Sequence, residues 1–248
     1  MDNHNIFEQE FPVFSYYVDY NRKLAPHYLL LMMQEVAWAH VEYHHIGWEF
    51  LAKANRFWAL IRLHVQIDRM PRWNEVVRLR TWGKPADLLL HYRDHEMVDE
   101  QGNVIIRSTS AWVILDFKTG RPQKAEDLPT HLYVNNTRHA IEKRAPKIKT
   151  ITLSETNPEY KPVLFSDLDV NQHVNNSKYL QFAIDAFDMN FLKTHELKDF
   201  NINFTRQAKA GDMYAVQFQE ESPFSFISSI YAKEGGELAR VQTSWKPI

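Results

Sequence analysis

The densest group of polar side chains in the sequence runs from residue 166 to residue 177, just before a predicted helix. Asp169, Asn171 and His173 occupy alternate positions within it. In an extended segment alternate side chains share one side, so a carboxylate, an amide and an imidazole are expected to converge there. The positive end of the helix dipole disfavours a charged imidazole at this place. A neutral imidazole at pH 7 is the form that a general base requires.

Two interpretations of this segment remain open on spacing alone. Free backbone N–H groups at a helix N-terminus can stabilise a developing oxyanion, which favours catalysis. Asp and Asn are also common helix caps, which favours a structural role. Capping needs one such residue and not a cluster, but the spacing by itself favours neither interpretation.

Helix and strand periodicities predict the elements that position this segment. Residues 26–45 read as a helix whose buried face shows helical spacing and holds Leu29, Met32, Met33 and Val36. Residues 59–67 alternate between apolar and polar, as in a strand with one buried face. Further strands are expected at 76–82, 88–99 and 104–116, the last two forming a hairpin.

The second half of the chain repeats this order of elements. A helix is predicted over 179–187, then strands at 200–204, 213–220, 225–233 and 237–246. A short motif also recurs near the end of each half: Ser110-Ala111-Trp112 resembles Thr243-Ser244-Trp245. The sequence therefore predicts an α+β fold made of a duplicated unit, one long helix followed by an antiparallel sheet.

A proline-containing segment with little periodicity joins the two halves. It is locally basic, and its cations include Arg138, Lys143, Arg144 and Lys147. Such an excess in an otherwise acidic chain suits an acidic partner. The alternative is a solvated linker, which the segment taken alone favours.

Composition excludes several classes of function. The chain has 29 Lys and Arg against 31 Asp and Glu, a net charge of -2, which argues against a nucleic-acid binder. It has no cysteine, which excludes a cysteine nucleophile and fits a reducing compartment. The glycines form no phosphate-binding or nucleophile-elbow motif. The polar N-terminus and the lack of a long apolar stretch predict a cytoplasmic protein without a membrane span.

A metal site is not expected either. His40 and His44 stand four residues apart on the first helix, as metal ligands can. However, position 41 is Val, and no carboxylate partner is evident in the sequence. Histidines on the surface of the helix are the favoured interpretation.

The run Leu168-Asp169-Val170-Asn171-Gln172-His173-Val174-Asn175-Asn176 resembles the signature of the acyl-acyl carrier protein thioesterases. The first half is similar to that family too, in Gln34-Glu35, in residues 58–82 and in Ser110-Ala111-Trp112-Val113. The resemblance implies two tandem hotdog domains, each a sheet wrapped around a long helix. It places an N-terminal domain at 1–125, a linker at 126–150 and a catalytic C-terminal domain at 151–248. The implied activity is hydrolysis of fatty acyl-carrier thioesters in fatty acid biosynthesis.

By this resemblance Asp169, Asn171 and His173 match the catalytic Asp, Asn and His of the family. A Glu-Cys pair of the plant members falls on Gln207-Ala208, which is a departure. Ala208 cannot attack a carbonyl, while Gln207 can orient a water. Two mechanisms remain: His173 and Gln207 activate a water, which we favour, or Asp169 attacks directly. Asn171 is expected to position His173 or to bind the carbonyl oxygen.

The resemblance also indicates the partners. An apolar acyl site is expected in the first hotdog, with the face formed by Leu29, Met32, Met33 and Val36 as its lining. Ordinary core packing is the simpler interpretation for each of these residues. The acidic acyl carrier protein gives weight to the stretch from Arg138 to Lys149 as a docking surface. No cofactor is implied.

Two rival functions and the assembly remain open. A coenzyme A thioesterase would use the same residues. A hotdog that binds acyl thioesters without cleaving them would explain the loss of Glu and Cys at Gln207-Ala208, but not the presence of Asp169, Asn171 and His173 together. Two hotdogs in one chain allow a monomer or a homodimer.

Overall fold

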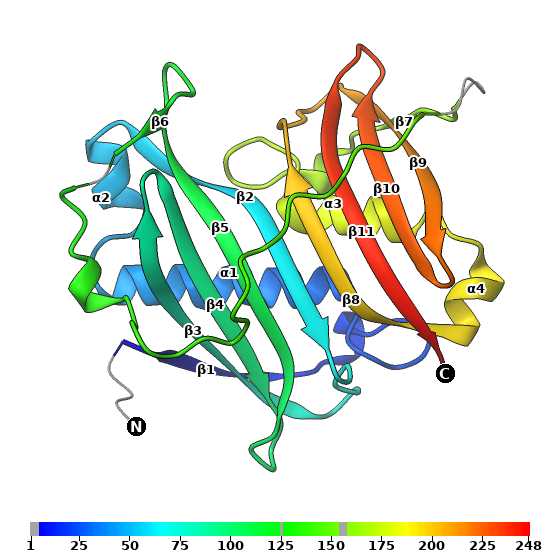
Figure 1. The fold of residues 1–248 in the computed structure, drawn as a ribbon, viewed down its shortest axis with the longest axis horizontal. Coiled ribbons are helices and arrows are strands. Elements are labelled where there is room, and N and C mark those ends of the chain that lie inside the picture. The colour runs from blue at the N-terminus through cyan, green and yellow to red at the C-terminus, as the bar shows by residue number, and fades with distance from the viewer. Residues whose placement is uncertain (1–4, 125, 154–157) are drawn as a thin grey trace.

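A computed structural model describes residues 5–124, 126–153 and 158–248. One antiparallel sheet of eleven strands wraps around the helices (Figure 1). The first half supplies strands in the spatial order β1-β3-β4-β5-β2, with β6 paired to β5. Their bounds are β1 Phe7–Pro12, β2 Arg56–Ile67, β3 Val76–Asp87, β4 Leu90–Val98, β5 Val104–Asp116 and β6 Pro122–Gln123.

The second half continues the same sheet in the order β8-β11-β10-β9-β7. Its strands are β7 Lys161–Pro162, β8 His195–Phe204, β9 Met213–Ser222, β10 Ser225–Ala232 and β11 Glu237–Pro247. The two halves meet where β2 pairs with β8, with Leu63 opposite Ile202. His64 Nε2 lies 2.8 Å from Asp199 Oδ2 across this junction.

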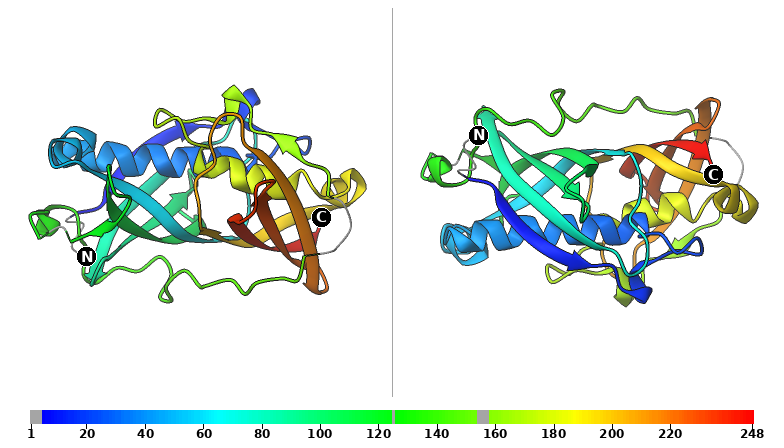
Figure 2. Two further views of the ribbon diagram at one scale, coloured as in Figure 1. Left: turned by 90° about the horizontal axis from the view of Figure 1, so that it is seen from above. Right: turned by 90° about the horizontal axis from the view of Figure 1, so that it is seen from below.

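The helices lie on the concave side of the sheet (Figures 1 and 2). They are α1 Pro26–Tyr43, α2 Trp48–Lys53, α3 Asn176–Ile184 and α4 Met189–Thr194. Pro26 suits the first helical position, where no backbone hydrogen bond is lost. Asn175 caps α3, its side chain accepting from the Ser177 backbone N–H at 2.9 Å.

The main hydrophobic core runs through both halves. It joins Leu29 and Val36 of α1, Val65 of β2, Leu180 of α3 and Ile202 of β8, all fully buried. Burial of this apolar surface is the main force that holds the two halves together.

The predicted order of long helix and antiparallel strands is present in both halves, but some elements were not expected. The short β1, β7, α2 and α4 have no counterpart in the sequence-based prediction. The second helix ends at Ile184, so Phe187 reaches the core from the following turn. These pieces are short, and tertiary pairing rather than periodicity creates them.

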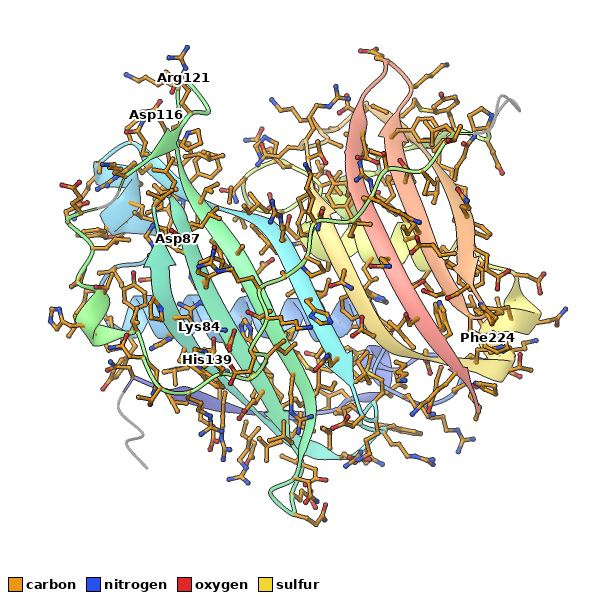
Figure 3. All side chains as sticks on the ribbon, in the orientation of Figure 1. Lys84, Asp87, Asp116, Arg121, His139 and Phe224 are labelled. Atoms are coloured by element: carbon orange, nitrogen blue, oxygen red, sulfur yellow. The ribbon has the colours of Figure 1, made fainter. Side chains whose placement is uncertain are left out.

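The segment between the halves crosses the outer face of the sheet, on the side opposite the helices (Figure 2). Trp82 Nε1 donates to the Arg138 carbonyl at 3.0 Å, and the Ala140 backbone N–H donates to Asp94 Oδ2 at 2.8 Å. Lys84, labelled in Figure 3, donates to the Ile141 carbonyl at 3.0 Å. This segment is therefore docked on the sheet, not a freely solvated linker.

No helix in the described part of the chain is long and apolar enough to cross a membrane.

Candidate functional site

Three of the predicted catalytic residues lie in one tight turn before α3. The Asp169 backbone N–H donates to the His173 carbonyl at 2.8 Å, and Leu168 pairs with Val174 on either side. Gln172 closes the turn in the left-handed region, with φ +64°. The turn thus brings Asp169, Asn171 and His173 together, as the sequence predicts.

The Asp169 side chain shapes this turn. Its Oδ1 accepts hydrogen bonds from the backbone N–H groups of Asn171 at 2.8 Å and of His173 at 3.3 Å. Such Asx turns are a common local role for Asp. The carboxylate is therefore held by the main chain of the turn, with Oδ1 engaged.

His173 is half-buried and lies against the segment that follows β8. Its backbone pairs with Lys209, and the Val174 N–H donates to the Ala208 carbonyl at 2.9 Å. Burial lowers the pKa of His173, the nearby charge of Lys209 lowers it further, and Asp169 opposes both. The imidazole is consequently neutral at pH 7, the form that accepts a proton.

Gln207 stands next to Ala208 in this same paired segment, so the chain fold carries it toward the turn. Its side chain is exposed, as is that of Asn171. Neither side-chain amide has a hydrogen bond to another described residue. Both amides are therefore free to bind a substrate oxygen or a water.

Helix α1 borders the site as well. The cap residue Asn175 donates from Nδ2 to Gln34 Oε1 on α1 at 3.5 Å. Helices α1 and α3 lie side by side (Figure 2). The turn therefore faces the boundary between the two halves, with the buried stripe of α1 behind it.

The first half contains a second copy of this turn, which sequence analysis missed. Asp19 Oδ1 accepts from the backbone N–H groups of Asn21 at 2.8 Å and of Lys23 at 3.1 Å. Arg22 has φ +59°, as Gln172 has +64°. The signal that could have found it is a pair of similar motifs, Val18-Asp19-Tyr20-Asn21 and Leu168-Asp169-Val170-Asn171, each with its Asp seven residues before the first residue of a helix.

The two copies differ in the residue that ends the turn. Lys23 stands where His173 stands, and its ammonium pairs with Glu196. The Asp side chain therefore fixes the turn in both halves, by accepting from the backbone of the Asn two residues later and of the residue that ends the turn. The imidazole is what distinguishes the copy in the second half.

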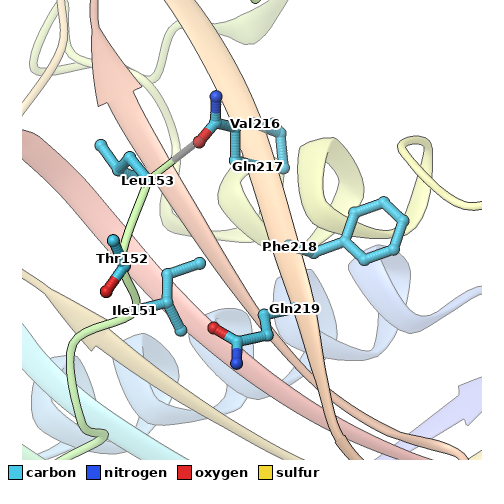
Figure 4. A pocket seen from close by; sticks show the side chains of 7 residues that line it. All are labelled: Ile151, Thr152, Leu153, Val216, Gln217, Phe218 and Gln219. Carbon is cyan, nitrogen blue, oxygen red and sulfur yellow. The ribbon is translucent and has the colours of Figure 1, made fainter. Parts of the chain in front are cut away.

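The four residues expected to line an acyl site are packed into the main core. Leu29, Met32, Met33 and Val36 are each at most 5% exposed. Two grooves lie elsewhere, on the outer face of the second half. The larger, about 450 Å³, lies between Ile151–Leu153 and Val216–Gln219 of β9 (Figure 4). The acyl lining therefore stays a prediction.

The expected docking residues lie on the docked segment, and two of them already have partners. Arg138 pairs with Glu96 and stacks over the Trp82 ring at 5.1 Å. Arg144 pairs with Asp87 at 2.8 Å. Lys143 and Lys147 are exposed and form no ion pair with a described residue. All four lie on the outer face of the sheet, whereas the turn lies on the helix side (Figure 2).

The histidines of α1 correct one expectation. His40 is 1% exposed and not on the surface, with its Nδ1 3.0 Å from Arg93 Nη1. The apolar stripe of the helix continues into His40, and periodicity alone cannot distinguish a buried histidine from an exposed one. The described residues contain no group of three or more His, Asp or Glu side chains arranged to hold a metal ion.

Comparisons with known proteins agree with this geometry. The acyl-ACP thioesterase N-terminal domain matches residues 4–133, and the acyl-ACP thioesterase C-terminal domain matches residues 151–247. Oleoyl-acyl carrier protein thioesterase 2 of Arabidopsis thaliana, a chloroplastic protein, is 28% identical over 92% of this chain and 67% of its own length. The palmitoyl-acyl carrier protein thioesterase of Cuphea hookeriana is 25% identical over 98% of this chain and 62% of its own length.

A crystal structure of an acyl-ACP thioesterase from Bacteroides thetaiotaomicron has the same fold, with a TM-score of 0.88, 23% identity and 98% of both chains covered. The predicted α+β fold of tandem hotdogs is thereby confirmed. The chain spans about two thirds of the length of its curated plant relatives. Because the two domain matches together cover most of the sequence, the chain belongs to the acyl-ACP thioesterase family.

Proposed function

We propose that the chain hydrolyses fatty acyl thioesters of the acyl carrier protein and releases the free fatty acid, with His173 as the general base. The observation that supports this most is the neutral, half-buried imidazole in a turn whose other copy ends in Lys23. A protein that only bound acyl thioesters would have no need for this difference between the copies. Family membership supplies the substrate class.

In the proposed reaction His173 accepts a proton from a water, and the water oxygen attacks the thioester carbonyl carbon. The tetrahedral intermediate collapses, the carbon–sulfur bond breaks, and the imidazolium returns its proton to the leaving thiolate. Gln207 orients the water. A thiolate is a good leaving group, so general-base catalysis and oxyanion binding suffice for this step.

We assign Asn171 the role of donating a hydrogen bond to the carbonyl oxygen of the thioester. Two of the first backbone N–H groups of α3 are engaged by its cap, Ser177 with the Asn175 side chain and Lys178 with the Asn175 carbonyl at 2.9 Å. The exposed Asn171 amide has no such partner among the described residues. It is therefore the better donor to a developing oxyanion.

The environment of Asp169 supports water attack over direct attack by the carboxylate. Its Oδ1 is held by two backbone N–H groups, which lowers its nucleophilicity and fixes its orientation. Single turnover in ¹⁸O-labelled water tests this choice. Label in the released acid supports water attack, and label found first in Asp169 would exclude it.

We also propose that the carrier docks on the helix side, around the turn. Phe165 and Val170 are 93% and 96% exposed beside it, and Arg206 and Lys209 add positive charge. Exposed apolar side chains in a region that also carries cations suit an acidic protein partner. The basic segment Arg138–Lys147 is the rival surface, on the opposite face of the sheet. Cytoplasmic location and assembly as a monomer or homodimer stay predictions.

The experiment that tests this function is a panel of acyl-carrier thioesters of varied length, with release of free acid as the readout. Matched coenzyme A thioesters run alongside. Turnover of carrier substrates supports the proposal. Turnover of coenzyme A substrates alone would favour the coenzyme A thioesterase, and tight binding without turnover would favour the non-catalytic binder.

A further inference from the structure

The concave face of the first half changes from apolar to polar along its strands. The register of β3, β4 and β5 places residues from each strand in successive rows across the sheet. One row is apolar and the next two are polar. In order they are Leu79, Met97 and Ile106; then Thr81, His95 and Ser108; then Gly83, Arg93 and Ser110.

Helix α1 shows the same change on the face that covers these rows. Its buried stripe is apolar through Met33 and Val36, and then reaches His40. His40 Nδ1 and Thr81 Oγ1 each lie 3.0 Å from Arg93 Nη1. We call Arg93, His40, Thr81, His95 and Tyr133 the Arg93 cluster; the charge of Arg93 acts on His40, His95 and Tyr133.

Arg93 is a deeply buried cation without an anionic partner. No carboxylate of a described residue forms an ion pair with it, because Asp94 and Glu96 of the same strand point to the opposite face, toward Ala140 and Arg138. Arg93 retains 8% of its surface, and its Nε and Nη2 form no hydrogen bond with a described residue. Leaving a buried guanidinium uncompensated is costly.

The neighbours of Arg93 also have unused polar atoms. His95 is 3% exposed, and its Nδ1 lies 3.1 Å from Ser108 Oγ while Nε2 has no hydrogen-bond partner. The buried hydroxyl of Tyr133, a residue that is 5% exposed, has none either. Burial and the charge of Arg93 lower the pKa of His40 to about 2 and of His95 to about 3, so both rings are neutral. The Arg93 cluster therefore contains hydrogen-bond donors without acceptors, and no carboxylate of a described residue compensates its charge.

The second half shows that the fold does not require this arrangement. Trp112 Nε1 donates to Ser110 Oγ at 2.9 Å, and Trp245 Nε1 donates to Thr243 Oγ1 at 3.0 Å, which aligns the two sheets. Arg93 pairs with Ser110 in register, and Phe226 pairs with Thr243. The counterpart of Arg93 is thus Phe226.

Phe226 packs into an aromatic core. Its ring centroid lies 5.0 Å from that of Phe187 and 5.6 Å from that of Phe191. An apolar filling of this position is therefore compatible with the same fold. The polar cluster in the first half needs another explanation.

The position of the cluster relative to the turn indicates that explanation. Gln34, which contacts the cap of α3 beside His173, and His40 both lie on α1. Six residues of helix separate them, about 9 Å of rise. Val36 and Ala37 lie between them on the buried stripe, so the cluster forms the far end of the apolar stretch expected to hold the acyl chain.

We propose, on the basis of the function proposed above, that the Arg93 cluster binds an acceptor oxygen at the distal end of the acyl chain. Such a chain ends in a carboxylate or a hydroxyl group. The guanidinium supplies charge-assisted donors, and Tyr133 Oη and His95 Nε2 are within the same cluster. The uncompensated charge favours the carboxylate over the hydroxyl.

The test compares carrier thioesters of one chain length that end in a methyl, a hydroxyl or a carboxylate group. Wild-type kcat/KM is expected to favour an oxygen-bearing chain over the methyl chain by at least about tenfold, the effect of one charge-assisted hydrogen bond. Arg93→Met should remove this preference by lowering kcat/KM for the oxygen-bearing chains toward that for the methyl chain. A wild-type preference for the methyl chain, or an unchanged preference in Arg93→Met, would overturn the proposal.

A second measurement is independent of catalysis and of the folding of the arginine variant. Titration calorimetry with methyl esters of one chain length, namely the monomethyl ester of the dicarboxylic acid and the methyl esters of the hydroxy acid and of the plain fatty acid, is expected to rank them in that order. Tyr133→Phe removes only one hydroxyl group and should weaken binding of the two esters with a distal oxygen alone. Equal binding of all three esters refutes the oxygen site even if the enzyme is active, whereas hydrolysis of no thioester refutes the proposed function and leaves the binding result to stand.

Discussion

Lys23 holds in the first half of the chain the place that His173 holds in the second. Both residues end a turn whose backbone is fixed by an Asp side chain, and both precede a helix on the concave side of the sheet. Lys23 is engaged with Glu196, while His173 is neutral and half-buried. The chain therefore contains an internal control for Asp169, in Asp19, and for His173, in Lys23.

The first prediction concerns the role of Asp169. Asp169→Asn keeps an oxygen that can accept the two backbone hydrogen bonds, so we expect the fold to be retained and kcat to fall by less than about tenfold. Asp169→Ala loses both acceptors and should destabilise the protein by about 0.5–2 kcal/mol, as loss of a cap does. Urea unfolding and steady-state kinetics measure the two effects.

Asp19→Ala is the matched control, with a similar loss of stability expected and no change in kcat. Complete inactivity of a folded Asp169→Asn protein would contradict water attack, because an amide cannot form the mixed anhydride.

The pH profile is the second prediction. Because burial and Lys209 lower the pKa of His173, its neutral form persists below the ordinary value of about 6.5. We expect kcat/KM to be flat through neutral pH and to fall only on the acid side, as the imidazole is protonated. Lys209→Met removes one cause of the lowered pKa and should move this acid limb to higher pH. An acid limb that moves to lower pH, or does not move, would contradict this electrostatic account.

The third prediction concerns the docked segment. Asp94 is fully buried, accepts from the Ala140 backbone and pairs with Lys84 at 3.2 Å. Asp94→Ala leaves a buried ammonium without its partner, and about 3–5 kcal/mol of stability should be lost. Hydrogen exchange at Ala140 should accelerate in parallel. Asp87→Ala, which removes the exposed partner of Arg144, is the control and should leave both readouts almost unchanged.

Carrier docking gives the fourth prediction. Reversing Arg206 to Glu, on the helix side, should lower kcat/KM for carrier substrates and weaken its dependence on salt. Turnover of a coenzyme A or pantetheine thioester should change much less. The same reversal at Lys143, Arg144 and Lys147 together should have little effect. If the triple reversal alone impairs carrier turnover, the docking surface is the outer segment instead.

Periodicity in the sequence was enough to predict the long helix, most long strands and their duplication, because each buries one continuous apolar face. The compact polar run before α3 gave the turn with Asp169, Asn171 and His173. The repeat of that turn at Asp19 was not predicted, because Lys23 occupies the position equivalent to His173 and no histidine marks a possible catalytic site there.

Other features depend on tertiary contacts that no local pattern contains. The basic segment lies docked on the sheet because Asp94, Lys84 and Trp82 bind its main chain. His40 is buried because Arg93 arrives from a strand more than fifty residues later in the chain. Sequence spacing cannot show either arrangement.

Comparison of His173→Gln with Lys23→Gln tests the central claim most directly. Both variants place the same Gln side chain at the end of equivalent turns, and thermal unfolding checks that both fold. With a carrier thioester as substrate, we predict that His173→Gln lowers kcat by about 10²–10⁴-fold, as loss of a general base does, while Lys23→Gln stays within about threefold of the wild type. A His173→Gln protein that folds and turns over at the wild-type rate would contradict the account.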